Sequence, residues 1–128
     1  MPGNEDCILT YSKNEVNPFK IQPEDINIED IAHSLSMMTR ANGHFKHFYS
    51  VAQHSINCSL EAKNRGLSKR IQLACLLHDA AEAYIADVPR PVKNKLIGYD
   101  KIEKKISNVV YSKFDLKELT DNEHKVIK

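Results

Sequence analysis

The sequence lacks the features that mark secreted, membrane-spanning or disulfide-bonded proteins. Its first residues contain no basic segment followed by an apolar run, so we expect no signal peptide. No stretch approaches the ~18 consecutive apolar residues that a membrane-spanning helix needs. The 3 cysteines are odd in number and form no CxxC pair, which indicates reduced thiols. These absences predict a cytoplasmic protein that does not bind membranes.

A surplus of charge of either sign is also absent. The formal net charge of the 128 residues is +1, and the sequence pI is about 7.7. The chain as a whole is therefore no electrostatic match for nucleic acid, and we predict no nucleic-acid partner. Repeats and low-complexity tracts are missing as well. A chain of this length is typical of one domain with a core that needs no disulfides.

Hydrophobic residues at helical spacing predict an all-α protein, a bundle of about five helices. Residues 1–20 are expected to form an irregular N-terminal arm with a short extended piece at 7–12, and residues 21–128 the helical domain. Segments 41–48 and 87–93 contain Asn-Gly or two prolines, so we expect a loop and a loop or broken turn there. The expected helices cover residues 23–40, 50–65, 68–86 and 99–116, with a last helix starting at Thr120.

The same spacing predicts which side chains face the core. Ile28 and Ile31 are expected to be buried in the first helix, and Leu73 in the third. Val109 and Val110 suit either the core or a contact between two copies, so a homo-oligomer is left open.

His78 and Asp79 stand side by side in a segment that is otherwise apolar. A buried charge is costly unless it is paired or binds a metal. Glu82 lies four residues after His78 and three after Asp79, so the three side chains share one face of a helix. His54, in the preceding helix, is twelve residues before Gly66, and His78 is twelve residues after it. In an antiparallel hairpin turning at Gly66, the two histidines therefore stand at the same level.

Two imidazoles and a carboxylate are a ligand set for zinc, manganese, cobalt or iron(II). Such a metal lowers the pKa of bound water, which becomes a nucleophile near neutral pH. Glu82 or Asp87 is placed to orient this water or take its proton. The alternative is a structural role, because an isolated His-Asp dipeptide is common by chance and a buried His and Asp can simply form a hydrogen-bonded network.

Three segments in this order resemble the HD-domain metal-dependent phosphohydrolases: EDINIEDIAHSLSMMTRANGH, FYSVAQHS and LLHDAAEAYIADVPRPVK. The likeness is to a small branch of phage, plasmid and bacterial proteins that includes 5′-deoxynucleotidases and dATP triphosphohydrolases. It covers roughly residues 8–128. The resemblance implies an HD-domain-like bundle and a divalent transition metal, with manganese, cobalt, zinc and iron all left open.

The resemblance also implies roles for individual residues. His54, His78 and Asp79 match the metal ligands, and Glu82 and Asp87 match the catalytic acids. Arg40 matches an arginine that holds the substrate phosphate, for which the donor fork of a guanidinium group is suited. Lys93 is either a further phosphate contact or a solvated lysine. His44 and His47, in the loop beside the expected pocket, are either substrate contacts or solvated side chains.

In the family a further aspartate on a later helix completes the metal site. By the pattern V-K-x-x-D it is expected just past Lys128, so residues 21–128 are expected to be an HD-type domain truncated at its C-terminus, with impaired activity. Three functions follow from these observations. The first is hydrolysis of a nucleotide, a deoxynucleoside mono- or triphosphate, by attack of metal-activated water. The second is a non-catalytic module that binds a nucleotide or a partner, and the third is a purely structural helical protein.

Overall fold

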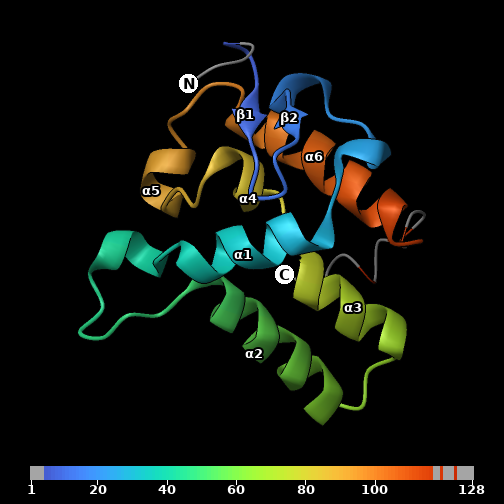
Figure 1. The fold of residues 1–128 in the computed structure, drawn as a ribbon. Coiled ribbons are helices and arrows are strands. Elements are labelled where there is room, and N and C mark those ends of the chain that lie inside the picture. Colours follow the sequence, from blue (N-terminus) through green and yellow to red (C-terminus); the bar gives the residue numbers. More distant parts are fainter. Residues whose placement is uncertain (1–4, 117–118, 120–122, 124–128) are drawn as a thin grey trace.

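The computed structural model describes residues 5–116, 119 and 123 and shows a small helical bundle (Figure 1). Helix α1 crosses the middle of the molecule, with α2 and α3 below it and α6 behind the N-terminal strands. The predicted all-α class is confirmed. The predicted last helix from Thr120 lies outside the described residues. The helices are α1 (Ile28–Met37), α2 (Val51–Asn64), α3 (Lys69–Leu77), α4 (Glu82–Ile85), α5 (Arg90–Lys93) and α6 (Tyr99–Lys113).

The N-terminal arm is partly ordered by a short antiparallel hairpin. Strand β1 (Ile8–Leu9), inside the predicted extended piece, pairs with β2 (Glu15–Val16). Val16 is only 1% exposed, and Pro18 at the start of a 3-10 turn (Pro18–Lys20) is also buried. The arm therefore contributes side chains to the same core as the helices.

The first helix begins later than predicted, at Ile28 instead of residue 23. Residues Pro23–Asp25 form a separate 3-10 turn, in which the Asp25 carboxylate accepts a hydrogen bond from the Gln22 N–H at 2.9 Å. Asn27 then caps α1, because its side-chain oxygen accepts from the Glu29 N–H at 2.8 Å. Ile28 was expected in the core but is 50% exposed, since it lies in the first turn of the shortened helix.

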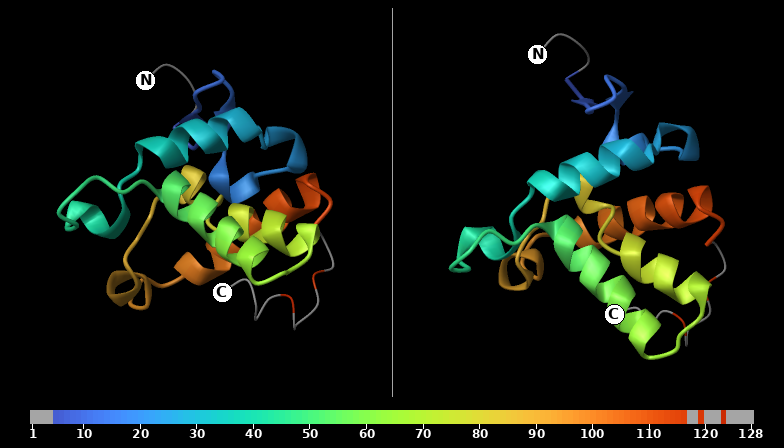
Figure 2. Two further views of the ribbon diagram at one scale, coloured as in Figure 1. Left: turned by 90° about the horizontal axis from the view of Figure 1, so that it is seen from below. Right: turned by 60° about the horizontal axis from the view of Figure 1, so that its bottom comes forward.

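Helices α2 and α3 form an antiparallel hairpin and lie side by side in Figure 2. Serine caps start both helices: the Ser50 hydroxyl accepts from Gln53 N–H, and the Ser68 hydroxyl accepts from Ile71 N–H. The turn between them passes through Gly66, whose φ of +73° suits glycine. The Ser59 hydroxyl donates to the Gln72 carbonyl at 2.9 Å and ties the two helices together.

The third helix is shorter than predicted. It ends at Leu77 instead of running to residue 86, and a separate turn of helix, α4, follows at Glu82–Ile85. The ring of His78 hydrogen-bonds the Cys75 carbonyl at 2.8 Å, and a side chain that bonds the backbone competes with continuation of a helix. The chain then closes tight turns, with Glu82 N–H donating to the Asp79 carbonyl at 3.0 Å. His78 and Asp79 consequently lie in a turn between two helices.

Two further expectations can be compared with the structure. The segment 87–93, expected to be a loop or a broken turn, contains one helical turn, α5, because prolines at the start of a helix lose no internal hydrogen bond. Leu73 is 37% exposed instead of buried. In α6, Ile106 and Val110 are buried whereas Val109 is half-buried.

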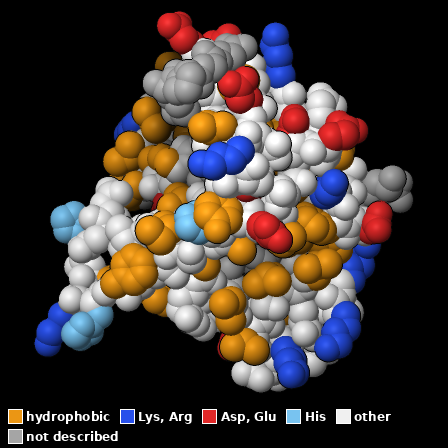
Figure 3. Space-filling model, in the orientation of Figure 1, with side chains coloured by type: hydrophobic (Ala, Val, Ile, Leu, Met, Phe, Trp, Pro, Cys, Tyr) orange, Lys and Arg blue, Asp and Glu red, His pale blue; other side chains and the backbone are white. Residues whose placement is uncertain are grey.

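Figure 3 shows Lys and Arg side chains around the lower end of the molecule, where the α2–α3 hairpin turns. Histidine side chains extend at the left, over the loop that joins α1 to α2. Within the part of the chain that the structure describes, no helix is both long enough and apolar enough to cross a bilayer.

Candidate functional site

The predicted site residues come from several separate parts of the fold, with Lys93 at the end of α5. Arg40 follows α1, His54 lies on the second turn of α2, and His78 and Asp79 occupy the turn after α3. Glu82 begins α4, and Asp87 follows that helix. Residues that are far apart in the sequence thus meet near the part of the fold where α1 contacts both α2 and α4.

The carboxylate of Asp79 is the centre of the cluster. Its Oδ2 atom lies 3.3 Å from His78 Nε2, 3.5 Å from His54 Nε2 and 3.7 Å from Arg40 Nη1. The ring centroids of the two histidines are 5.8 Å apart, in agreement with their equal distance from Gly66 in the sequence. Three cationic or metal-binding side chains therefore converge on one oxygen atom.

A hydrogen bond to the backbone determines which nitrogen of His78 faces Asp79. The Cys75 carbonyl is only an acceptor, so His78 Nδ1, 2.8 Å away, must carry the proton and donate. In the neutral imidazole, Nε2 then presents a lone pair to the Asp79 oxygen at 3.3 Å. Two acceptors at this distance repel each other unless a proton or a metal ion lies between them.

Backbone hydrogen bonds on both sides of residues 41–48 hold Arg40 beside α2. Arg40 N–H donates to the Tyr49 carbonyl, and Val51 N–H donates to the Met38 carbonyl, each at 2.9 Å. Between these bonds the chain turns sharply, with positive φ angles at Ala41 and Asn42. The loop is thereby closed at its base, which places the guanidinium group next to Asp79.

Glu82 is a buried acid beside two other acids. It is only 6% exposed, and as an ionised group it has no donor for its Oε1 atom within the described residues. Burial, followed by the charges of Asp79 and Asp87, raises the pKa of Glu82 from 4.5 to about 10. In the absence of a bound cation it therefore carries a proton at neutral pH, which it shares with Asp79 or Asp87 by hydrogen bonding.

Asp87 is positioned by a strained residue that ends α4. Ala86 has φ +89° and ψ 161°, a conformation that side chains other than glycine rarely adopt. Its N–H donates to the Glu82 carbonyl at 2.8 Å, and its carbonyl accepts from the Tyr99 hydroxyl at 2.9 Å. These two bonds hold the chain in this conformation and direct Asp87 towards Glu82.

Lys93 is connected to α6 and not to the Asp79 cluster. Its ammonium group lies 3.1 Å from Glu103 Oε2 and 5.4 Å from the centre of the Tyr99 ring. Burial raises the pKa of Tyr99 most. The negative charges of Glu103 and then Glu82 raise it further. Lys93 thus lies at the edge of the acidic region, in contact with residues of α6.

Cys58 is the member of this region that the sequence did not indicate. In the sequence it occupies an apolar position of the second helix, although its spacing of four residues from His54 places both on one face. Its Sγ atom lies 3.5 Å from His54 Nε2. One ligand atom each from His54, Cys58 and His78 can be chosen so that the three lie within 4.8 Å of one another.

The electrostatic surroundings favour the neutral forms of His54 and Cys58. Burial, and then the positive charge of Arg40, lowers the pKa of His54, so that its imidazole is available as a neutral ligand at neutral pH. Burial, and then the charge of Asp79, raises the pKa of the Cys58 thiol.

The distances suit a divalent transition metal. Around a tetrahedral ion with bonds of about 2.0–2.3 Å, ligand atoms lie about 3.3–3.6 Å apart. His54 Nε2 and His78 Nε2 lie 3.5 Å and 3.3 Å from Asp79 Oδ2. The facing lone pairs of His78 and Asp79 also call for a cation between them. Each histidine therefore has the separation from Asp79 that two ligands of one metal ion require.

A row of aromatic rings leads from the exposed loop to the cluster. Phe45 and Tyr49 have ring centroids 6.0 Å apart, and Tyr49 and His54 have centroids 6.4 Å apart. Asn57 donates to the Tyr49 hydroxyl at 2.8 Å and fixes that ring. Phe45 and Phe48 are 51% and 69% exposed, so this end of the row is open to solvent.

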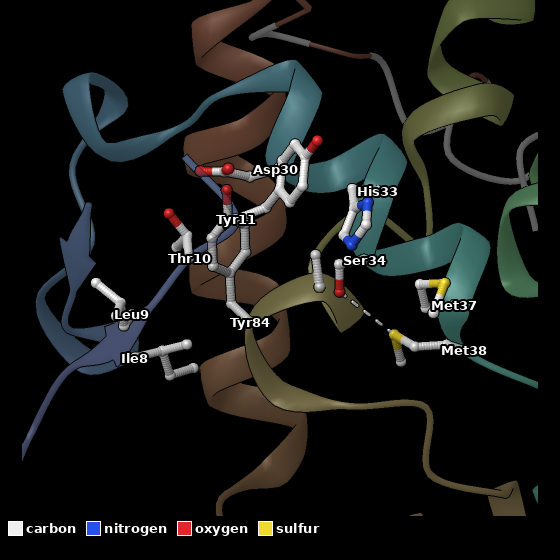
Figure 4. Close-up of a pocket in the computed structure, with 11 residues that line it drawn as sticks. Ile8, Leu9, Thr10, Tyr11, Asp30, His33, Ser34, Met37, Met38 and Tyr84 are labelled. Carbon is white, nitrogen blue, oxygen red and sulfur yellow. Dashed lines mark hydrogen bonds between the residues drawn. The ribbon is translucent and has the colours of Figure 1, made fainter. Parts of the chain in front are cut away.

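A separate cavity of about 490 Å³ lies between the N-terminal hairpin, α1 and α4 (Figure 4). The rings of Tyr11 and His33 stack at 3.9 Å on one side of it, which gives His33 a packing role. Asp30, in its wall, accepts hydrogen bonds from the Ser12 N–H at 2.7 Å and the Ser12 hydroxyl at 2.9 Å. None of the predicted site residues lines this cavity.

Comparison with known proteins finds relatives of undefined activity. No family model matches the chain. The chain is 42% identical over 109 residues to the uncharacterized protein YfdR of Escherichia coli, an alignment that covers 85% of this chain and 58% of that protein. It is 39% identical over 99 residues to the uncharacterized protein RCAP_rcc00048 of Rhodobacter capsulatus, covering 73% of this chain and 50% of that protein. The chain thus spans about half the length of these curated relatives, and their names assign no chemistry to it.

Proposed function

We propose that the protein is a metal-dependent phosphohydrolase that acts on a nucleotide, a deoxynucleoside mono- or triphosphate. The observation that carries the proposal is the convergence of His54, His78 and Arg40 within 3.7 Å of one oxygen of Asp79. A metal-binding set beside a phosphate-binding cation is what phosphate ester hydrolysis requires. The resemblance of the sequence to HD-domain phosphohydrolases supports the same chemistry.

In this proposal His54, His78 and Asp79 hold the metal. When bound, a divalent ion supplies a Lewis acid that polarises a phosphoryl oxygen and makes water more acidic. The bond from His78 Nδ1 to the Cys75 carbonyl fixes the orientation of the ring, so that Nε2 is the nitrogen aimed at the site. The lowered pKa of His54 likewise keeps its ring neutral and able to bind.

Glu82 and Asp87 handle the proton of the attacking water. Glu82 is buried between two other acids, and the low local dielectric makes its protonation state sensitive to any nearby cation. A carboxylate in this position orients the water and holds its proton, and the neighbouring Asp87 receives or returns that proton. Because both residues belong to or follow α4, one short helix would position the whole acid pair.

Arg40 and the adjoining loop would bind the substrate. The Arg40 side chain is 30% exposed, so its guanidinium group is accessible to a phosphate beside Asp79. Phe45 and Phe48 offer exposed aromatic faces on which a nucleobase can stack. This arrangement favours a nucleotide as the substrate over a smaller phosphate ester that has no base to stack.

The proposal includes a reducing, cytoplasmic environment, because Cys7, Cys58 and Cys75 are free thiols. A homo-oligomer stays a prediction, with the half-buried Val109 on α6 as one contact.

The deciding experiment measures product release from a panel of deoxy- and ribonucleoside mono- and triphosphates. Each is incubated with manganese, cobalt, zinc or magnesium, and with a chelator as control. We expect turnover that needs metal and is lost in Asp79→Ala, with phosphate or tripolyphosphate as the product that identifies the bond cut. E. coli YfdR is assayed in parallel because this chain spans only 58% of it. Nucleotide binding without turnover in both proteins would favour the binding-module hypothesis instead.

A further inference from the structure

We infer that the Cys58 thiolate is a direct ligand of the metal held by His54 and His78, and that it makes the site selective for thiophilic ions such as zinc, cobalt and cadmium. This inference rests on the metal site of the proposed function but not on the reaction or its substrate. Neither the sequence pattern nor the resemblance assigns a role to Cys58.

The distances place the sulfur within reach of an ion bound by His54 and His78. Cys58 Sγ lies 3.5 Å from His54 Nε2, which is the nitrogen that also faces Asp79 Oδ2 at 3.5 Å. A nitrogen and a sulfur bound to one tetrahedral ion are about 3.5 Å apart, given metal bonds of about 2.05 and 2.3 Å. His54 thus has the separation of a shared metal ligand from both the thiol and the carboxylate.

Chemistry argues for coordination over a simple hydrogen bond. A thiol is a weak donor, and the sulfur lies beside the His54 ring, 3.5 Å from Nε2 and 4.0 Å from Nδ1, which is a poor direction for a hydrogen bond. Rotation of the ring brings the Nε2 lone pair and the sulfur onto one ion. As a thiolate, in contrast, sulfur is a strong ligand for zinc, cobalt and cadmium and a poor one for magnesium or manganese. Binding of the ion releases the thiol proton to solvent, and the sulfur lone pair forms the bond to the metal.

The local structure fixes the thiol where the ion would bind. His54 and Cys58 are on adjacent turns of α2, and Ser59, the next residue, ties this part of α2 to the Gln72 carbonyl on α3. His78 is positioned by the other helix of the same hairpin. The three donors therefore belong to one rigid hairpin, and one ligand atom of each can be chosen so that all three lie within 4.8 Å of one another.

The test is binding of cobalt(II) to the substrate-free protein, followed by optical absorption. A thiolate ligand produces a charge-transfer band in the near ultraviolet, whereas bound cobalt with only nitrogen and oxygen ligands shows only visible d–d bands. We expect the charge-transfer band in the wild type and in Cys7→Ser, and its loss in Cys58→Ser with the visible bands retained. We also expect Cys58→Ser to weaken zinc and cadmium binding about tenfold or more and manganese binding less than about threefold.

A second measurement does not depend on folding of a variant. Zinc should protect Cys58 of the wild-type protein from alkylation, while Cys7 in the same molecule reacts at an unchanged rate. Visible bands without a charge-transfer band would overturn the thiolate ligand and leave the proposed phosphohydrolase standing. Absence of both bands would overturn the metal site altogether, and with it the proposed function.

Discussion

Two buried carboxylates, on the neighbouring helices α1 and α4, have opposite surroundings. Asp30 on α1 is 3% exposed, and Glu82 on α4 is 6% exposed. Both oxygens of Asp30 accept hydrogen bonds from Ser12, one from its N–H and one from its hydroxyl. Glu82 instead has two further acids as neighbours and a pKa raised to about 10.

This difference in hydrogen bonding separates an acid with a structural role from an acid whose protonation state can change. A carboxylate that is satisfied by hydrogen-bond donors is stable in its charged form and joins the N-terminal arm to α1. A carboxylate that lacks donors is stable only when it gains a proton or a cation, so its state can change during a reaction. Burial alone therefore does not identify the functional acid. The following predictions test this contrast, from the largest effect to the smallest.

Asp79→Asn should have the largest effect. It removes the charge on which His54, His78 and Arg40 converge, so we expect loss of metal binding and a decrease in turnover of about 10³-fold or more. Metal content after dialysis and the rate of product release measure the two effects. Circular dichroism controls for folding. Turnover within tenfold of the wild type would show that the reaction takes place elsewhere.

Glu82→Gln should decrease turnover about 10²–10⁴-fold, the range typical of a lost general base. Metal binding should be retained, because we assign the ligand role to Asp79 and the histidines. Asp30→Asn is the matched control, since it also converts a buried carboxylate into an amide. If both variants lost turnover equally, the distinction between the two acids would be wrong.

The same Glu82→Gln variant should stabilise the metal-free protein. Because the pKa of Glu82 is raised from 4.5 to about 10, the folded state retains a proton that the unfolded state loses between these pH values. The free energy of unfolding of the wild type should therefore decrease as the pH rises through that window. Glutamine does not titrate, so the variant lacks this pH dependence. We expect its free energy of unfolding to exceed that of the wild type by about 1–2 kcal/mol at the alkaline end of the window. Urea denaturation at several pH values with a chelator present measures it.

Asp30→Asn and Ser12→Ala should each lower the free energy of unfolding by about 1–3 kcal/mol, because each leaves a buried polar group without its partner. Turnover should stay within about twofold of the wild type at a temperature where the variants are folded. Denaturant unfolding measures the loss of stability, and the nucleotide assay measures the turnover. A stable variant with lost turnover would place Asp30 in the mechanism.

Lys93→Ala should have the smallest effect. The ion pair with Glu103 is partly exposed, and such pairs contribute less than about 1 kcal/mol. We expect Lys93→Ala and Glu103→Ala to change stability by similar small amounts and the KM for nucleotide by less than about threefold. A much larger KM in Lys93→Ala alone would instead assign this lysine to the substrate phosphate.

Much of the site could be predicted because helix geometry is local. The equal distances of His54 and His78 from Gly66 predict their proximity, which the ring separation of 5.8 Å agrees with. The serine caps that start both helices of the hairpin are also local features of the sequence. The all-α class likewise follows from hydrophobic spacing. The roles of the residues as metal ligands and acids stay predictions until the assays above are done.

Other features could not be predicted because they depend on contacts across the fold. The break after Leu77 depends on a hydrogen bond that the His78 ring makes to the backbone, and helix periodicity carries no trace of it. Cys58 looked like an apolar position, because only the packed hairpin shows that its sulfur adjoins a histidine nitrogen. Lys93 had two possible roles, and its pairing with Glu103 depends on the fold of α6 against α5.

Local sequence thus determined the class of the fold, the helix caps and the level at which the two histidines meet, since turn chemistry and the 3.6-residue period act within a few residues. Tertiary structure alone decided which buried carboxylate receives hydrogen-bond donors and which lies beside other acids. Asp30 and Glu82 are both acids in short helical segments, and only the side chains brought to them by distant parts of the chain distinguish them. The physical reason is that the free energy of a buried charge depends on its neighbours in space and not on its neighbours in sequence.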